Sequence, residues 1–292
     1  MQTIERCKRV SFENILFATD FSSHSDAALP YALSIARKFG SKIFPVHVVS
    51  LSPFANSSPT LALQAVAAQA IREAKASIAK LEPRLAGISH EAIVRKGELA
   101  DQLSAIIAEK GINLIVAGTR GRTGVSKFLM GSVAEKIFRQ APCPVLTVGP
   151  NVSGEPGAIA DIHAILLPVD FSPESMAAAP YAISLAQENQ ARLYLLHVTA
   201  ELVDRETEQS LKSRLLSLVP QDTELLCEPK AYVSCGQAPQ EILELAEELA
   251  VDLMVLGVKP TARFPSSTAH LAMATAYKVV SDAICPVLTV RG

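Results

Sequence analysis

The segment Gly118–Ser132 carries residue types that suit the binding of a polyphosphate. Its sequence is GTRGRTGVSKFLMGS, in which Gly121 and Gly131 follow Gly118 and a serine comes directly after Gly131. Glycine lets the backbone approach a ligand closely, and consecutive N–H groups in such a loop form a concavity that binds anions. Ser132 is expected to begin a helix, whose first N–H groups and dipole also favour an anion. The spacing therefore predicts a phosphate cradle.

Positive side chains in the same segment support this interpretation. Arg120, Arg122 and Lys127 add mobile positive charge to the loop. The alternative is that the glycines only form turns and Ser132 only caps a helix. The full spacing, placed between an apolar strand-like run and a helix-like segment, favours the cradle. Neither G-x-x-x-x-G-K-[ST] nor a G-x-G-x-x-G after the first strand occurs, which argues against a P-loop ATPase and a dinucleotide-binding enzyme.

The chain contains two copies of one domain. The segments 12–36 (FENILFATDFSSHSDAALPYALSIA) and 162–186 (IHAILLPVDFSPESMAAAPYAISLA) share 13 of 25 residues, and the hexapeptide CPVLTV occurs near the end of each copy. The stretch between the copies, PNVSGEPGAIA, has the composition of a linker. We therefore expect one domain over residues 1–150 and a second over residues 161–292.

Each copy alternates apolar strand-like runs with segments of helical length. Strands that are apolar throughout and separated by helices are typical of a parallel sheet covered on both faces. The expected fold class is therefore α/β, with two doubly wound domains. In the first copy the expected strands are 15–19, 42–49, 90–95, 113–117 and 145–148, and the expected helices are 25–39, 61–85, 99–110 and 132–140.

Two strand ends of the first copy carry polar residues. Asp20 follows the first strand and the glycine loop follows the fourth. Ligands of such sheets bind beyond the carboxyl ends of the strands, so both features face one crevice if these strands are neighbours. Asp20 has an alternative role as the cap of the next helix, and its retention as Asp170 in the second copy weakens a purely ligand-binding role. His47 and His197, at matched strand ends, are expected to be structural.

The second copy lacks the cradle. Aligned on the fourth strand, Gly121 corresponds to Pro260, which has no N–H and cannot adopt a positive φ. Aligned on CPVLTV, Met273 and Ala274 replace the last Gly-Ser pair of the motif. Arg263 and the hydroxyl residues after it leave open a different anion site. We expect one phosphate site, in the first domain, and a second domain that stays vacant and serves as a structural partner.

Composition and charge exclude several classes of function. Hydrophobic residues make up 49% and charged residues 19% of the chain, so either half can bury a core. The net charge of −2 argues against nucleic-acid or membrane-surface binding. No apolar run approaches a membrane span, and residues 1–10 lack the apolar core of a signal peptide. Five cysteines without C-x-x-C spacing argue against a disulfide framework or a zinc site and indicate reduced thiols in a cytoplasm.

The chain resembles the universal stress protein family. The G-2x-G-9x-G-[ST] loop, the T-D-F-S end of the first strand, the H-V end of the second and the closing P-V-L-T-V strand all match motifs of that family. The resemblance covers nearly all of 11–149 and, more weakly, 162–290, and the chain is similar to tandem-type members. It implies a five-stranded Rossmann-like domain with strand order 3-2-1-4-5 in each copy.

The resemblance also implies an adenine nucleotide in the first domain: ATP, or otherwise AMP or ADP. A Mg²⁺ ion between the phosphates fits this implication, because Mg²⁺ takes few protein ligands. Val48 would bind adenine through its backbone, Asp20 would lie near the adenosine, and the loop would wrap the ribose and phosphates. The residues that the resemblance implies at the nucleotide are Ala18, Thr19, Asp20, Val48, Gly118, Thr119, Arg120, Gly121, Arg122, Gly131, Ser132 and Val133.

Three functions are compatible with these features. The first is a sensor or regulatory protein in the stress response, whose nucleotide-ordered loop a protein partner reads. The second is a slow ATPase or phosphotransferase, although no acidic residue lies between Gly118 and Ala134 to act as a base. The third is a scaffold without a ligand, against which the intact loop argues.

The last strand of each copy suggests how the copies associate. The runs 145–148 and 287–290 are apolar and are expected at sheet edges, where a bare strand is a template for association. We expect them to pair with each other as an intramolecular pseudo-dimer. Members of the family dimerise through this strand, and a further homodimer of the whole chain stays open.

Overall fold

The computed structural model describes residues 10–50, 61–119, 137, 141–152, 161–259 and 267–292. Within these ranges the chain forms two compact units. The N-terminal unit holds residues 12–145, and the C-terminal unit holds residues 10–11, 146–152 and 161–292. This boundary falls earlier in the chain than the boundary between the two sequence copies. Residues 146–152 belong to the C-terminal unit, although the first copy extends to residue 150.

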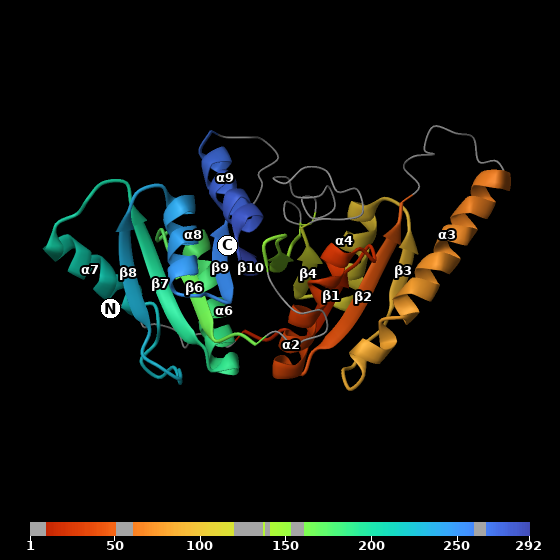
Figure 1. The fold of residues 1–292 in the computed structure, drawn as a ribbon, viewed down its shortest axis with the longest axis horizontal. Coiled ribbons are helices and arrows are strands. Elements are labelled where there is room, and N and C mark those ends of the chain that lie inside the picture. The colour runs from red at the N-terminus through yellow and green to blue at the C-terminus, as the bar shows by residue number, and fades with distance from the viewer. Residues whose placement is uncertain (1–9, 51–60, 120–136, 138–140, 153–160, 260–266) are drawn as a thin grey trace. The chain divides into compact units, whose positions relative to one another are not determined.

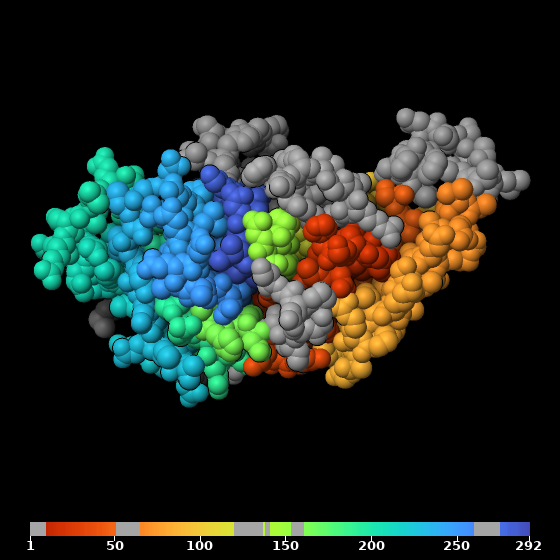
Figure 2. Space-filling view, viewed as in Figure 1, coloured from red at the N-terminus to blue at the C-terminus, as the bar shows by residue number. Residues whose placement is uncertain are grey.

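The N-terminal unit is a parallel sheet with helices packed on it (Figure 1). Its elements are β1 (Asn14–Ala18), α1 (Ser23–Asp26), α2 (Leu29–Phe39), β2 (Lys42–Val49), α3 (Leu61–Ala79), the 3₁₀ helix η2 (Glu82–Leu85), β3 (Ile93–Lys96), α4 (Leu99–Lys110) and β4 (Leu114–Gly118). The strands lie in the order β3-β2-β1-β4, and all three neighbouring pairs are parallel. Helix α3, orange in Figure 2, forms part of the surface of this unit.

The C-terminal unit repeats this architecture. Its elements are β5 (Val145–Val148), β6 (Ala164–Pro168), α6 (Pro173–Asn189), β7 (Arg192–Thr199), α7 (Arg205–Leu216), β8 (Lys230–Cys235), α8 (Ala238–Glu248), β9 (Leu253–Val258), α9 (Ser267–Asp282) and β10 (Val287–Arg291). The strands lie in the order β5-β10-β9-β6-β7-β8. The pairs from β10 to β8 are parallel.

The strand order confirms the predicted α/β fold, with one difference. In the second copy the order β8-β7-β6-β9-β10 is 3-2-1-4-5, and the first copy shows the first four positions of the same order. Its fifth strand, β5, lies beside β10 and belongs, from Leu146 on, to the C-terminal unit. The chain after β5 is held there as well, because Asn151 Nδ2 donates a hydrogen bond to the backbone oxygen of Asp282 at 3.1 Å.

Apolar side chains of β1 and β4 form the core of the N-terminal unit. Ile15, Leu16 and Phe17 are fully buried. Leu16 packs with Ile106 of α4 and Ile115 of β4 on one face of the sheet, while Ile15 and Phe17 alternate to the other face. Burial of each such side chain stabilises the folded state by roughly 1.5–3 kcal/mol. The packed sheet holds the carboxyl ends of its strands in fixed positions.

Two expected helices are interrupted near prolines. The expected helix 25–39 is divided into α1 and α2, with Pro30 at the start of α2, and the expected helix 61–85 ends early, with Pro83 in η2. Proline has no N–H to continue a helical ladder. Pro180, the counterpart of Pro30, lies inside the continuous helix α6, so this proline permits the break without forcing it. None of the helices in the described ranges is both long and apolar enough to cross a bilayer.

The two copies end their helices with different residues. In the first copy Gly40 and Gly111 end α2 and α4 in the left-handed conformation, at φ of +65° and +59°, as the sequence predicts. The matched residues of the second copy are Gln190 and Ala250, which adopt the same conformation at φ of +52° and +46°. A side chain makes this conformation about 1–2 kcal/mol less favourable than it is for glycine.

Candidate functional site

The chain leaves β1 through the tight turn Asp20-Phe21-Ser22. Phe21 adopts a left-handed conformation with a φ of +62°. Asp20 Oδ1 accepts a hydrogen bond from the Ser22 N–H at 3.0 Å, and Thr19 Oγ1 accepts one from the Phe21 N–H at 3.0 Å. Ser22 caps α1, because its Oγ accepts from the Ser25 N–H at 3.1 Å. The interpretation of Asp20 as the helix cap is therefore wrong, and its carboxylate instead holds the turn before the helix.

His47 of β2 supports this turn. Its Nδ1 lies 2.8 Å from the backbone oxygen of Thr19, and its ring stacks on Phe21 with the centroids 4.6 Å apart. A left-handed residue with a side chain costs about 1–2 kcal/mol, and the ring contact offsets part of that strain. His47 therefore has the structural role expected from the sequence.

The second copy repeats the turn in detail. Phe171 has a φ of +59°, and its ring lies 4.9 Å from that of His197. The Nδ1 of His197 lies 2.7 Å from the backbone oxygen of Val169. Asp170 Oδ1 accepts from the Ser172 N–H at 3.0 Å, as Asp20 does in the first copy. The turn therefore belongs to the frame that both copies share.

Asp170 is negatively charged at neutral pH. Burial raises its pKa, but hydrogen bonds from the hydroxyls of Ser172 and Ser175 and from the Ser172 N–H outweigh burial and leave the pKa below its usual range. The Ser172 hydroxyl donates to Oδ1 at 2.5 Å. Hydrogen-bond donors therefore stabilise the charged form of this carboxylate.

The glycine near the end of the fourth strand has a packing role in both copies. A Cβ on Gly118 would overlap the backbone oxygen of His24 and would lie 3.1 Å from the Cα of Ser25. A Cβ on Gly257 would overlap the backbone of Glu174, at the start of α6. Only glycine lets the helix that follows the first strand approach so closely. The first glycine of the loop motif is thus required by the fold.

Half of the predicted nucleotide residues lie in the described chain, and the structure brings them to one edge of the N-terminal sheet. Ala18 lies opposite Val46 of β2 and Ala117 of β4 in the parallel register, so the ends of these three strands are adjacent. The residues at this edge are Ala18, Thr19, Asp20, Val48, Gly118 and Thr119. The predicted residues that lie outside the described ranges are Arg120, Gly121, Arg122, Gly131, Ser132 and Val133.

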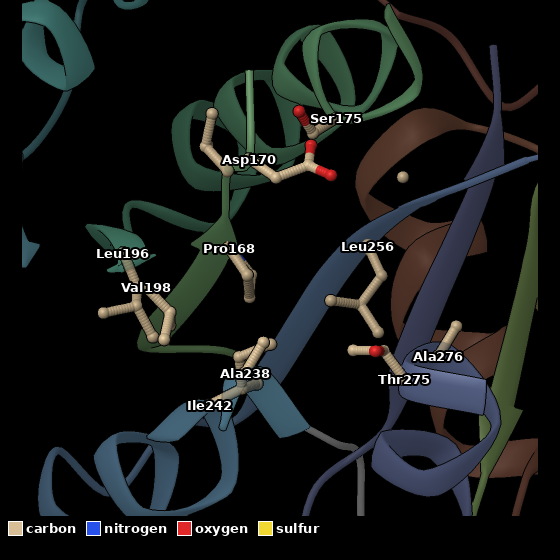
Figure 3. Close-up of a pocket in the computed structure, with 12 residues that line it drawn as sticks. Pro168, Asp170, Ser175, Leu196, Val198, Ala238, Ile242, Leu256, Thr275 and Ala276 are labelled. Carbon is tan, nitrogen blue, oxygen red and sulfur yellow. The ribbon is translucent and has the colours of Figure 1, made fainter. Parts of the chain in front are cut away.

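A cavity of about 160 Å³ opens at the matching edge of the C-terminal unit (Figure 3). Polar groups of Asp170, Ser175 and Thr275 line part of it. Pro168 and Val198 are the counterparts of Ala18 and Val48, each 150 residues further along the chain. The apolar wall is formed by Pro168, Leu196, Val198, Ala238, Ile242 and Leu256.

Sequence reasoning missed this cavity because it followed only the phosphate loop. Its walls come from β6, α6, β7, α8, β9 and α9, which are spread along the chain. The available signal was the retention of Asp170 and Val198 at the offset of 150 residues from Asp20 and Val48. These two residues indicate that the second copy keeps the carboxyl edge of its sheet even though it has lost the phosphate loop.

Helix α9 takes the place of the last part of the phosphate loop in the second copy. The helix begins at Ser267, and Met273, Ala274 and Thr275 align with the final Gly-Ser-Val of the loop motif. Within a helix, N–H groups beyond the first four are bonded to carbonyls of the same helix. The N–H groups of these three residues are therefore not donors for a phosphate.

Comparison with known proteins identifies the family. The model of the universal stress protein family matches residues 11–149 and again residues 162–291. The chain belongs to the universal stress protein family. The two matches cover both sequence copies, which makes it a tandem-domain member, and membership supports a role in the stress response.

Individual relatives match either one copy or the whole chain. A universal stress protein of Methanocaldococcus jannaschii is 30% identical over 139 residues, which are 47% of this chain and 82% of that protein. A universal stress protein of Mycolicibacterium smegmatis is 26% identical over 294 residues and covers 95% of this chain and 96% of its own length. The crystal structure of a universal stress protein from Archaeoglobus fulgidus has a TM-score of 0.71 at 21% identity and covers 96% of this chain and 97% of that one. It shares the fold.

Proposed function

We propose that this universal stress protein is a regulatory protein that binds an adenine nucleotide, ATP in the first instance, in its first domain. The observation that carries the proposal is the position of Gly118 and Thr119. They lead from the end of β4 into the glycine-rich, cationic segment, at the same sheet edge as Asp20 and Val48. Parallel sheets bind their ligands at this edge.

The proposed site divides into a base pocket and a phosphate segment. Ala18, Thr19, Asp20 and Val48 would line the adenosine side, on rigid strand ends. The phosphates would lie on backbone N–H groups of the glycine-rich segment, because such groups bind anions without any loss of side-chain freedom. The residues of that segment in the proposal are Gly118, Thr119, Arg120, Gly121, Arg122, Gly131, Ser132 and Val133.

The donor set near the site suits a Mg²⁺ ion held mainly by phosphates. Within the described ranges no group of three or more His, Cys, Asp or Glu residues could hold a metal ion. Asp20 is the carboxylate at this edge, and its Oδ1 already accepts the Ser22 N–H at 3.0 Å. Mg²⁺ usually keeps several waters and binds through substrate phosphates with few protein ligands. We therefore assign no protein cage to the ion.

Slow hydrolysis of ATP is the alternative function. A fast phosphotransferase needs a base or a residue that positions the attacking water. Asp20 is the carboxylate at the described edge, but its bond to Ser22 fixes it in the turn. Phosphate release over time distinguishes the alternatives, because a sensor retains ATP whereas an enzyme releases phosphate steadily and is left with ADP.

Binding of ATP to two reciprocal variants tests the proposal. Gly131→Met introduces into the first copy the residue that stands at the matched position of the second, and we expect it to weaken ATP binding at least about a hundredfold. The matched control is Met273→Gly in the second copy, which should leave the affinity unchanged. Calorimetry on the full chain measures both. Equal affinity of Gly131→Met and the natural protein would contradict the site assignment.

We also propose that the domains 1–150 and 161–292 form an intramolecular pseudo-dimer through their last strands. The neighbouring positions of β5 and β10 support it. Both strands are apolar and buried along most of their length. Covalent linkage gives such a pair a high effective concentration. A regulatory protein partner would then read the nucleotide-bound first domain.

A further inference from the structure

The cavity of the C-terminal unit offers a chemistry that differs from that of the proposed nucleotide site. Its volume is about 160 Å³, and a buried apolar cavity of about 150 Å³ holds one benzene molecule. The cavity therefore accommodates a single ring with a short substituent. A nucleoside triphosphate is larger than this cavity.

One end of the cavity is polar and negatively charged. Figure 3 shows Asp170 and Ser175 together at the start of α6, with the apolar side chains of Pro168, Val198 and Leu256 on the walls. Asp170 is exposed at this end and stays charged, because the hydroxyls of Ser172 and Ser175 and the Ser172 N–H donate hydrogen bonds to its carboxylate. A positively charged group on a ligand would form a charge-assisted hydrogen bond with this carboxylate.

The start of α6 does not make this end attractive to anions. A helix N-terminus favours negative charge, but here that charge is already supplied by Asp170. Two of the N–H groups at this end are also occupied, because Ser172 N–H bonds to Asp170 Oδ1 at 3.0 Å and Ser175 N–H bonds to Ser172 Oγ at 3.3 Å. An anionic ligand would face the carboxylate, whereas a cation would complete the arrangement.

We propose that the C-terminal cavity binds a small cationic ring compound that carries no phosphate, with its positive group directed at Asp170 and its ring against Pro168, Val198 and Leu256. Thr275 presents its hydroxyl from α9 on another side of the cavity. This site is independent of the proposed nucleotide site, and it replaces the expectation that the second domain stays vacant.

Three probes that share one ring and differ in charge test the proposal on the full chain. Benzamidine is cationic, benzyl alcohol is neutral and benzoate is anionic. Ligand-detected NMR should show benzamidine binding most tightly and benzoate at least about tenfold more weakly. Benzoate binding as tightly as benzamidine, or no binding of benzamidine at millimolar concentration, would overturn the proposal.

Two variants locate the binding. Asp170→Asn keeps the shape of the side chain and removes its charge, so it should abolish the preference for benzamidine over benzoate. Ala238→Phe fills the cavity and should abolish binding of all three probes. Asp20→Asn, the matched change in the first domain, should leave benzamidine binding unchanged. Thermal unfolding of each variant shows whether it folds. If Asp170→Asn does not fold, Ala238→Phe still tests where the probes bind.

Competition separates this site from the proposed nucleotide site. Saturating ATP should leave benzamidine binding unchanged, because the phosphate-free cavity and the glycine-rich segment belong to different domains. Displacement of benzamidine by ATP in the Gly131→Met variant would place the nucleotide in the C-terminal cavity and would overturn this inference. Loss of ATP binding in that variant with retained benzamidine binding would support both proposals separately.

Discussion

The two copies of the domain share a frame and differ in the segment after the fourth strand. Both have a left-handed phenylalanine whose ring contacts a histidine of the second strand, and both have a glycine in the fourth strand against which the helix after the first strand packs. In the first copy the fourth strand leads into a glycine-rich segment with three cations. In the second copy it leads to Pro260 and then to helix α9.

This difference shows which parts of a family motif serve the fold. The Asp-Phe-Ser turn and Gly118 are repeated in a copy that has lost the last Gly-Ser pair of the loop. Their hydrogen bonds and close contacts give a structural reason for keeping them. The residues that we expect to touch a phosphate are among those that change between the copies, and we therefore expect the difference in ligand chemistry to arise there.

The largest expected effect on the shared frame comes from the matched glycines. Gly118→Ala and Gly257→Ala place a Cβ onto the backbone of the neighbouring helix start, and each should lower the free energy of unfolding by about 2–3 kcal/mol. Denaturant titration of each variant measures the loss. Gly149→Ala is the control, because its Cβ would lie 3.3 Å from its nearest atom, the backbone oxygen of Val280, and should cost less. A stability loss in only one of the two matched variants would contradict the shared frame.

The matched histidines should have the next largest effect. His47→Ala and His197→Ala remove the ring that stacks on Phe21 or Phe171 and the contact of Nδ1 with a backbone oxygen. Each should lower the free energy of unfolding by about 1–2 kcal/mol, the value of a partly buried hydrogen bond with ring packing. Equal losses in both copies are expected from thermal unfolding. A loss of ATP binding in His47→Ala without any loss of stability would assign the histidine to the ligand instead.

The helix ends offer a change in the opposite direction. Gln190→Gly and Ala250→Gly put glycine at the left-handed positions that Gly40 and Gly111 occupy in the first copy. Relief of the left-handed strain should raise the free energy of unfolding by about 0.5–1 kcal/mol each, after the greater flexibility of glycine in the unfolded chain is subtracted. The reverse changes, Gly40→Ala and Gly111→Ala, should destabilise by a similar amount. If Gln190→Gly and Ala250→Gly both lower the free energy of unfolding, the left-handed conformation at these positions is not strained.

The smallest expected effect concerns an ion-pair cluster on the N-terminal unit. Glu91 accepts hydrogen bonds from Lys110 Nζ at 2.6 Å and Lys42 Nζ at 2.8 Å, which lower its pKa from 4.5 to about 2. The aligned residue of the second copy is Lys230. Because the folded state lowers this pKa, the stabilisation is complete above pH 4.5 and disappears as the pH falls through about 2.

Glu91→Gln should therefore lower the melting temperature at pH 7 by only about 1–2 °C, since exposed ion pairs contribute little. The difference from the natural protein should shrink as the pH is lowered toward 2 and as salt is added. Glu73→Gln, which removes an exposed carboxylate hydrogen-bonded to Gln69, is the control. A difference that grows on acidification would contradict the assigned direction of the pKa shift.

The sequence predicted the repeated architecture because buried parallel strands leave a strong apolar pattern. It also predicted the helix ends at Gly40 and Gly111, where glycine adopts the left-handed conformation. It did not predict Phe21 in that conformation, since phenylalanine has no local preference for it and the supporting ring contact comes from His47 on another strand. The bond from the Ser22 N–H to Asp20 is local, and the sequence did not distinguish it from a helix cap.

The cavity could not be read from the sequence for a related reason. Its apolar wall gathers side chains from four elements, and none of Leu196, Ile242 or Leu256 differs in type from an ordinary core residue. Only the packing of α8 and α9 against the strand ends leaves space between them. The site residues Arg120, Gly121, Arg122, Gly131, Ser132 and Val133 lie outside the described ranges and stay predictions.

The number of ATP molecules bound per chain tests the central claim most directly. A calorimetric titration of the full chain with ATP and Mg²⁺ should give one site per chain, and Gly131→Met should remove it while Met273→Gly leaves it in place. Two equivalent sites, or one site that survives Gly131→Met, would show that the loss of the Gly-Ser pair in the second copy does not decide where the nucleotide binds.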